Sequence, residues 1–297
     1  MKWLLFSDLD GTLLNHDDYS FEDARPVLER IRREGIPLVI ASSKTRAEVE
    51  AIQDEMGLRM PFIVENGGGI YFPRGCRGIP YMPGSAREPY FAVRLGMPYG
   101  EIREFVTRIR QRIPLRGFGD MPVEEVARLT DLPLERARLA KEREFSEPFL
   151  LDDGERLPEL IGLAEEIGLS VTRGGRFFHL VRRGQDKGTA ARFVKEFFQR
   201  TWSDEIRTIG LGDSRNDIPL LMAVDDPVQI PSPGGKGLRF QIPGLMVADV
   251  PGSLGWRRAV EGILGWTGAS DGTNAGNGRN GQVDDRTGDE RGGKEIP

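Results

Sequence analysis

The sequence predicts an α/β protein whose core is a parallel sheet with helices on both faces. Two observations predict this class. Short apolar runs alternate with amphipathic helical patterns up to residue 64, and the same alternation returns after residue 186. Strands separated by helices of this length are typical of a parallel sheet. The 297 residues suffice for one large domain or two ordinary ones.

The first strand is expected over Trp3–Ser7, an apolar run that ends just before a pair of carboxylates. A helix follows, because apolar residues recur at spacings of four and three. These residues are Ala24, Leu28 and Ile31. We expect Asp23 to cap the N-terminus of this helix and Gly35 to end it.

A second strand and a second helix are expected next. Ile36–Ala41 predicts a buried strand, and Thr45 with Glu48 forms a capping-box pattern that opens a helix. The apolar face of this helix carries Val49, Ile52 and Met56. Gly57 ends the helix, and Pro61–Val64 predicts the third strand.

Residues 85–183 show a different pattern, which predicts an inserted α+β segment. Candidate strands lie at Tyr90–Arg94, Ser170–Thr172 and Phe177–Val181. One helix is expected from Glu101 to Ile113, because apolar residues line one of its faces. We therefore divide the chain into a core formed by 1–84 and 184–267 and a cap formed by 85–183.

The core pattern returns after the insertion. Lys187 opens a helix, Ile206–Leu211 predicts a strand, and a loop and a short helix follow at Gly212–Asp217 and Ile218–Ala223. The segment 268–297 is dominated by small and polar residues. It cannot bury enough apolar surface to offset the entropy of ordering, so we predict a disordered tail.

Composition excludes several classes of function. The 41 Lys and Arg against 46 Asp and Glu give a net charge of -5, which argues against a nucleic-acid partner. The single cysteine, Cys76, excludes an internal disulfide framework and any multi-cysteine metal site. No apolar run reaches the roughly 20 residues that span a bilayer, and the apolar start meets Ser7 too early for a signal peptide. We expect a cytoplasmic enzyme without a membrane partner, and its oligomeric state stays open.

The strongest chemical signal is Asp8-Leu9-Asp10-Gly11-Thr12, directly after the first strand. In an open parallel sheet, ligands bind at the carboxyl ends of the strands. Two carboxylates so close together repel each other unless a cation neutralises them. Mg²⁺ binds one or two carboxylates together with water and a substrate phosphate. The motif therefore predicts a site for a divalent cation such as Mg²⁺.

The motif resembles the first motif of the haloacid dehalogenase-like phosphohydrolases, Asp-x-Asp-x-Thr. The resemblance implies a Rossmann-like parallel-sheet core with an inserted α+β cap domain of the Cof type. It also implies that Asp8 is the nucleophile and that Asp10 is the general acid and base. An aspartate nucleophile splits phosphate transfer into two easier steps.

The other motifs of this family occur in the expected order. Ser42 ends the second strand and matches the phosphate ligand, and Ser43 and Lys44 extend its loop onto a helix N-terminus, a natural anion site. Lys187, in the sequence Asp-Lys-Gly, matches the lysine that supports the phosphoryl group.

The fourth motif follows the strand Ile206–Leu211. By resemblance Asp213 binds the metal ion together with Asp8 and Asp10, while Asn216 and Asp217 hold the metal shell or Lys187 in place. Arg215 departs from the expected proline. The resemblance covers residues 1–265.

Several stretches resemble more closely one branch of the family, the mannosyl-3-phosphoglycerate phosphatases. They are Ser42–Arg46, Glu65–Gly68, Arg143–Phe149, Thr172–His179 and Gly212–Asp217. This resemblance implies Mg²⁺-dependent hydrolysis of a sugar joined to 3-phosphoglycerate, which completes the synthesis of the compatible solute mannosylglycerate.

Polar residues of the insertion and of the third strand are expected to bind this substrate. The segment Arg173, Gly174, Gly175 and Arg176 offers two guanidinium groups and an accessible backbone. These groups are suited to bind a carboxylate or a phosphate. Glu65 and Asn66 follow a strand and could bind sugar hydroxyls, as could Glu147 in the cap. His179 is interpreted equally well as a packed residue or as a substrate contact.

Other functions stay open at this point. The sugar could be glucose, or the substrates could be broader sugar phosphates, since a few cap contacts would distinguish one hydroxyl's configuration. A phosphomutase or phosphotransferase would deliver the phosphoryl group to a sugar instead of water. A non-catalytic phosphosugar-binding module would not need the complete set of catalytic groups that this sequence contains.

Overall fold

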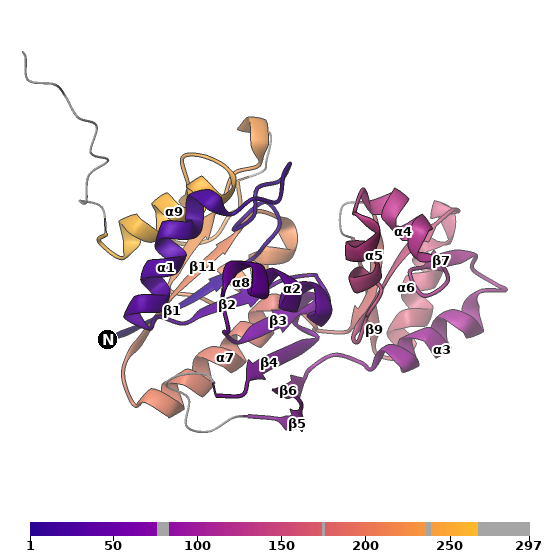
Figure 1. Ribbon diagram of the computed structural model, residues 1–297. Coiled ribbons are helices and arrows are strands. Elements are labelled where there is room, and N and C mark those ends of the chain that lie inside the picture. Colours follow the sequence, from indigo (N-terminus) through magenta and orange to yellow (C-terminus); the bar gives the residue numbers. More distant parts are fainter. Residues whose placement is uncertain (76–82, 174–175, 236–238, 267–297) are drawn as a thin grey trace, which may run out of the picture.

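The computed structural model describes residues 1–75, 83–173, 176–235 and 239–266. Two separate sheets organise these residues into two units that lie side by side (Figure 1). The predicted tail and two of the predicted binding residues, Gly174 and Gly175, lie outside the described residues. Among the helices that are described, none has both the length and the apolar character needed to cross a bilayer.

A nine-stranded sheet forms the larger unit, in the order β13-β12-β11-β1-β2-β3-β4-β6-β5. The neighbours from β13 to β3 are parallel, which confirms the predicted α/β class. These strands are β13 (Met246–Val247), β12 (Asp226–Gln229), β11 (Ile206–Gly212), β1 (Lys2–Ser7), β2 (Leu38–Ala41) and β3 (Phe62–Val64). The antiparallel strands are β4 (Gly69–Pro73), β6 (Tyr90–Arg94) and β5 (Ser85–Arg87).

Helices cover both faces of this sheet. Successive side chains of a strand point to opposite faces, so Leu5 packs on one side of β1 while Leu4 and Phe6 pack on the other. Three helices cover the side of Leu5, namely α1 (Arg25–Glu34), α2 (Arg46–Met56) and α9 (Gly252–Ile263). The opposite side is covered by α7 (Lys187–Trp202) and α8 (Ile218–Leu221).

The ends of the core helices mostly follow the predicted local signals. The capping box of α2 is present, with Glu48 N donating to Thr45 Oγ1 over 3.2 Å and Thr45 N donating to Glu48 Oε2 over 2.9 Å. The prediction for Asp23 is wrong, because Ala24 is the N-cap of α1. Asp23 lies in a preceding 3-10 turn, whose backbone already satisfies the first N–H groups.

The smaller unit contains a four-stranded antiparallel sheet in the order β7-β8-β10-β9. Its strands are β7 (Leu115–Gly117), β8 (Ser146–Leu151), β10 (Phe178–Arg182) and β9 (Leu169–Arg173). One apolar cluster joins the sheet to α3 (Tyr99–Ile109) and α6 (Leu157–Glu166). A second cluster, around Phe118, involves α4 (Val123–Thr130) and α5 (Leu134–Ala140).

The start of the insertion differs from the sequence-based division. We placed Tyr90–Arg94 in the cap, but this strand is β6 and pairs with β4 of the large sheet, and β5 pairs with β6 in turn. Both strands therefore extend the core sheet. The chain passes to the smaller unit after β6 and returns between β10 and α7 (Figure 1).

Candidate active site

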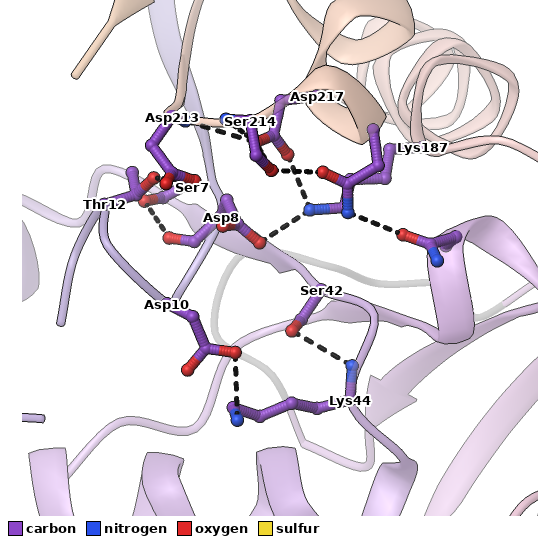
Figure 2. A network of polar contacts seen from close by, with 12 residues as sticks. Ser7, Asp8, Asp10, Thr12, Ser42, Lys44, Lys187, Asp213, Ser214 and Asp217 are labelled. Carbon is purple, nitrogen blue, oxygen red and sulfur yellow. Dashed lines mark hydrogen bonds and ion pairs between the residues drawn. The ribbon is translucent and has the colours of Figure 1, made fainter. Parts of the chain in front are cut away.

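The ends of β1 and β11 bring the two acidic motifs together. These strands pair in parallel with Ser7 opposite Leu211, and Asp8 N donates to the Leu211 carbonyl over 3.0 Å. Asp8 therefore lies beside the loop that begins at Asp213. Figure 2 shows Asp8, Asp213 and Asp217 facing one another, and ligand oxygens of the three carboxylates lie within 4.8 Å of one another.

Lys187 joins two of these carboxylates. Its Nζ lies 2.6 Å from Asp8 Oδ1 and 2.6 Å from Asp217 Oδ1, and its side chain is fully buried. Burial by itself would lower the pKa of Lys187, but the charges of Asp217 and Asp8 raise it above its ordinary value. Gly188 allows this position, because a Cβ there would overlap the carbonyl of Pro219 in α8.

Asp217 uses both of its oxygens in contacts with the protein. Oδ1 pairs with Lys187, while Oδ2 accepts from Ser214 N over 3.0 Å, from Ser214 Oγ over 3.1 Å and from Asp213 N over 3.2 Å. Asp217 therefore orients Lys187 and the loop that carries Asp213. This is the supporting role that we predicted for Asp217.

Asp213 is placed against the first motif. Thr12 Oγ1 donates to Asp213 Oδ1 over 3.5 Å, and a Cβ at position 11 would lie only 2.6 Å from Asp213 Oδ2. Gly11 also has a φ of +73°, a conformation that side chains disfavour. Glycine at this position therefore allows the Asp213 carboxylate to approach the loop that follows Asp8.

The carboxylate cluster fits a divalent cation. The three carboxylates outnumber the single ammonium group in the cluster by two charges. Burial, followed by the charge of Asp217, raises the pKa of Asp8 well above its ordinary value and that of Asp213 to about 6. A cation would offset this repulsion, and a set of ligands made only of oxygen atoms suits a hard ion.

Asp10 lies outside this cluster. Its Oδ2 is 3.0 Å from Lys44 Nζ, and Figure 2 shows the pair on the side of Asp8 away from Asp213. Its Oδ1 is buried and has no hydrogen-bond partner among the described residues. We predicted Asp10 as a metal ligand, whereas its carboxylate here pairs with Lys44. The predicted role of Lys44 as a substrate contact would require this pair to open.

Ser42 is buried at the end of β2. Its Oγ accepts from Lys44 N over 3.1 Å, and Figure 2 places this hydroxyl between Asp8 and the Asp10–Lys44 pair. The N-terminus of α2 follows at once, so backbone N–H groups and a hydroxyl gather beside the carboxylates. This arrangement can bind an anion.

A cavity of about 770 Å³ opens between the two units beside this site. Its core wall includes Ser43, Asn66 and Asn216, and its cap wall includes Thr172, Arg173, His179 and Val181. Asn216 Nδ2 donates to Asn66 Oδ1 over 3.1 Å, so these two side chains contact each other across the core wall. The size is that of a small-molecule pocket.

Three of the predicted substrate residues line the cavity, namely Ser43, Asn66 and Arg173. Arg176 does not. Its guanidinium donates to the Leu129 carbonyl and lies 3.9 Å from Asp131, at the junction of α4 and α5. The side chain of Arg176 therefore contacts the helices of the cap.

Glu65 contacts the cap instead of facing the cavity. Its side chain is fully buried, and its oxygens accept from Glu144 N over 2.8 Å, from Phe145 N over 3.1 Å and from Ser146 Oγ over 2.6 Å. Burial raises the pKa of Glu65. We predicted a contact with sugar hydroxyls, but this carboxylate anchors the start of β8 to the core.

Glu147 lies inside the cap. Its Oε1 accepts from Gly119 N over 2.9 Å and lies 3.3 Å from Arg103, on α3, while its Oε2 has no partner in the described part of the chain. Glu147 is opposite Leu180 in the sheet, and Leu180 belongs to the apolar cluster under α3 and α6. The predicted substrate contact is therefore not present.

Several residues of the cavity wall were not predicted from the sequence. They are Thr172, Val181, Gln185, Ser214 and Arg215. His179, which we interpreted equally well as a packed residue or as a substrate contact, lines the cavity. The period of two along β10 provided a signal, because His179 and Val181 share one face of this strand.

Known protein families and individual proteins show similarity to this chain. A model of the haloacid dehalogenase-like hydrolase family matches residues 5–75. A glucosyl-3-phosphoglycerate/mannosyl-3-phosphoglycerate phosphatase of Persephonella marina is 51% identical over 261 residues, which cover 88% of this chain and 97% of that protein. A mannosyl-3-phosphoglycerate phosphatase of Pyrococcus furiosus is 36% identical, with 75% and 88% covered.

Solved structures share the fold at lower identity. A protein of Thermoplasma acidophilum aligns with a TM-score of 0.62 at 20% identity, over 89% of this chain and 99% of its own. A phosphatase of the haloalkanoate enzyme superfamily from Bacteroides thetaiotaomicron aligns with a TM-score of 0.61 at 19% identity, with 89% and 96% covered. The resemblance seen in the four motifs is thus confirmed, and the chain belongs to the haloacid dehalogenase-like hydrolase family.

Proposed function

We propose that this protein is a phosphatase that hydrolyses the phosphate ester of mannosyl-3-phosphoglycerate, of glucosyl-3-phosphoglycerate, or of both. The observation that carries the proposal is the buried contact of Asp8 with Lys187, next to Asp213 and at the edge of a cavity between core and cap. The substrates are those named for the relatives from Persephonella marina and Pyrococcus furiosus.

In the first proposed step, a carboxylate oxygen of Asp8 attacks phosphorus, and the bond from phosphorus to the glycerate oxygen breaks. Lys187 holds the other oxygen of Asp8, so the attacking oxygen has a defined direction. Asp10 donates a proton to the leaving oxygen, which departs as an alcohol. The Ser42 hydroxyl and the N-terminus of α2 bind the phosphoryl oxygens.

In the second step, water attacks the aspartyl phosphate and Asp10 accepts a proton from that water. The bond between phosphorus and Asp8 breaks, so the carboxylate of Asp8 and inorganic phosphate are released. Asp10 is thereby reprotonated for the next cycle. This sequence consumes one water molecule per ester and requires a flexible Asp10, whose contact with Lys44 must open for each proton transfer.

We propose that the metal ion is Mg²⁺ and that Asp8 and Asp213 hold it, close to the loop that follows Asp8. Bound Mg²⁺ would neutralise charge on the phosphoryl oxygens. Asp217 and Asn216 would hold the surrounding loop, since Asp217 has both oxygens engaged by protein groups.

The cavity wall provides groups for the rest of the substrate. Asn66 and Asn216 on the core side and Thr172 on the cap side can donate to and accept from sugar hydroxyls. Arg173 adds a positive charge to the cap side. Mannose and glucose differ at one hydroxyl, so few contacts separate the two proposed substrates.

The test measures Mg²⁺-dependent phosphate release from mannosyl-3-phosphoglycerate, glucosyl-3-phosphoglycerate, free 3-phosphoglycerate and hexose phosphates. We expect the highest kcat/KM for one or both glycosyl esters and no turnover by Asp8→Asn, since an amide is a poor nucleophile. Higher rates on hexose phosphates would overturn the substrate assignment. Normal kcat in Asp8→Asn would overturn the mechanism.

A further inference from the structure

Arg143 is a half-buried cation at the junction of core and cap that the mechanism above does not use. Its Nη1 donates to the Ser43 carbonyl over 2.9 Å, and its Nε donates to the Ala140 carbonyl over 2.9 Å. Ser43 lines the cavity and follows the proposed phosphate ligand Ser42. Arg143 therefore connects the cap to the loop expected to bind the phosphate.

The charge of Arg143 lacks a counter-ion in the part of the protein that the structure describes. Its two hydrogen-bond acceptors are neutral carbonyls, and no carboxylate lies within salt-bridge distance. Arg46 and Arg103, which are also half-buried at or near this junction, each pair with a carboxylate. A cation partly removed from water without an anion is unfavourable, which indicates that a ligand provides the anion.

The carboxylate of Glu65 does not fill this role. The charge of Arg143 acts on Glu65 and opposes the rise in the pKa that burial causes. However, three donors from residues 144–146 already occupy the Glu65 oxygens.

Burial, with a smaller contribution from Arg143, lowers the pKa of His179 to about 4. His179 is therefore neutral near pH 7 and does not compete for an anion.

The backbone around Arg143 is held firmly. The next residue, Glu144, donates its N–H to Glu65, while its carboxylate accepts from Arg46 Nε over 2.9 Å, from the Tyr71 hydroxyl over 2.8 Å and from Arg87. These partners come from α2, β4 and β5 of the core. Arg143 thus has a fixed position relative to the phosphate loop, as a recognition residue requires.

We propose that Arg143 binds the carboxylate of the substrate and so selects phosphate esters that carry a second anionic group close to the phosphate. This inference rests on the proposed function and deepens it. A guanidinium matches a carboxylate with two parallel hydrogen bonds. The phosphate and the carboxylate of 3-phosphoglycerate are joined by a short skeleton, and Arg143 Nη1 lies 2.9 Å from the carbonyl oxygen of Ser43, the residue that follows Ser42.

The first test compares a glycosyl-3-phosphoglycerate with p-nitrophenyl phosphate, which has no carboxylate. We expect Arg143→Met to lower kcat/KM roughly 10- to 100-fold for the glycosyl ester and by less than about 3-fold for the aryl ester. Arg143→Lys should recover part of the loss. Equal losses on both esters, or no loss on either, would overturn the proposal.

Arg138→Met is the matched control, because it removes the same charge from the same part of the cap. Arg138 is exposed on α5 and pairs with Glu135 over 3.0 Å. It should leave both rates unchanged. Thermal unfolding of all variants shows whether a loss of activity reflects a loss of folded protein.

The second test measures binding and does not depend on the proposed glycosyl substrate. In the Asp8→Asn background, calorimetry compares 3-phosphoglycerate with glycerol 3-phosphate, which lacks the carboxylate. We expect Arg143→Met to raise the Kd of 3-phosphoglycerate about 10-fold or more and to leave that of glycerol 3-phosphate unchanged. If this shift occurs although the wild type hydrolyses neither glycosyl ester, only the proposed function fails. If the parent shows no preference or the shift is absent, the role of Arg143 is wrong.

Discussion

Core and cap both contain buried charges, but the two units satisfy them differently. In the core, Lys187 lies between Asp8 and Asp217, at 2.6 Å from each, and is fully neutralised by the protein. In the cap, Arg143 donates hydrogen bonds only to carbonyl groups among the described residues, and one oxygen of Glu147 has no partner there. The core thus has a preformed set of reacting groups, whereas the cap provides charge for a ligand. Variants of the reacting groups should affect every phosphate ester, whereas variants of the cap and of its anchor should affect mainly the esters that carry the groups bound by the cap.

The largest effect is expected for Lys187→Met. Removing the ammonium group leaves two buried carboxylates facing each other, so we expect kcat/KM to fall at least about 10³-fold on both aryl phosphate and glycosyl ester. Breaking a buried pair also costs about 3–5 kcal/mol of unfolding free energy. Steady-state kinetics and urea unfolding measure the two losses.

Lys195→Met is the control for this variant, because Lys195 also lies on α7 but pairs with Asp225 nearer the surface. It should change either quantity little. A loss confined to the glycosyl ester in Lys187→Met would contradict the division of roles between core and cap.

The next effect is expected for Glu65→Gln, which tests the anchor between the units. An amide has one acceptor oxygen for three donors and presents its own N–H groups to them. We expect a loss of about 1–3 kcal/mol in stability and a KM for the glycosyl ester that is roughly 10-fold higher. kcat on p-nitrophenyl phosphate should change less than about 3-fold.

Glu55→Gln is the matched control for the anchor. Glu55 also joins core and cap, through an ion pair with Arg136, but it is exposed. An exposed pair contributes roughly 0–1 kcal/mol, so Glu55→Gln should retain both KM and stability. If both variants behave alike, the anchor assigned to Glu65 is incorrect.

A smaller effect separates two neighbouring arginines. Arg173 lines the cavity, whereas Arg176 contacts Leu129 and Asp131 away from it. Arg173→Met should raise KM for the glycosyl ester about 5- to 10-fold, and Arg176→Met less than about 2-fold. The same kinetic assay tests both, and the reverse order would show that the sequence-based assignment of Arg176 was correct.

The smallest effect at neutral pH concerns His179. Burial and Arg143 lower the pKa of His179 from 6.5 to about 4, so the unfolded chain takes up a proton before the folded protein does. The stability contributed by neutral His179 is therefore full above pH 6.5 and is lost as the pH falls towards 4. Between pH 7 and pH 5, the free energy of unfolding of the wild type should fall by at most about 2 kcal/mol more than that of His179→Gln.

Urea unfolding at several pH values checks this difference. His16→Gln is the control, since His16 is exposed and should follow the wild type. If the free energies of unfolding of the wild type and of His179→Gln change with pH in the same way, His179 is not a buried, neutral residue.

Much of the core followed from local rules. The capping box of Thr45 and Glu48 and the glycines that end α1 and α2 involve residues a few positions apart, so the sequence shows them directly. The parallel arrangement of β1 and β11 then brings Asp8 next to Asp213, because both follow strand ends on the same edge. The helix ends follow from residues that are neighbours in the sequence, and the meeting of Asp8 and Asp213 follows from the parallel direction of the two strands.

The cap could not be predicted to the same depth. Glu65 and Glu144 are 79 positions apart, and their contact depends on how the insertion docks on the core. Whether a carboxylate after a strand faces a cavity or a neighbouring unit is decided by that docking. The same reason explains β5 and β6, which pair with the core sheet although they lie inside the predicted cap.

The sequence by itself determined the α/β core, its family and the order of its four motifs. Only the tertiary structure decided that Glu65 anchors the cap, that Asp10 pairs with Lys44, and that Arg143 has no counter-ion among the described residues. Propensity and periodicity act between near neighbours in the chain. Charge pairing and burial depend on distances in space, which the sequence does not state.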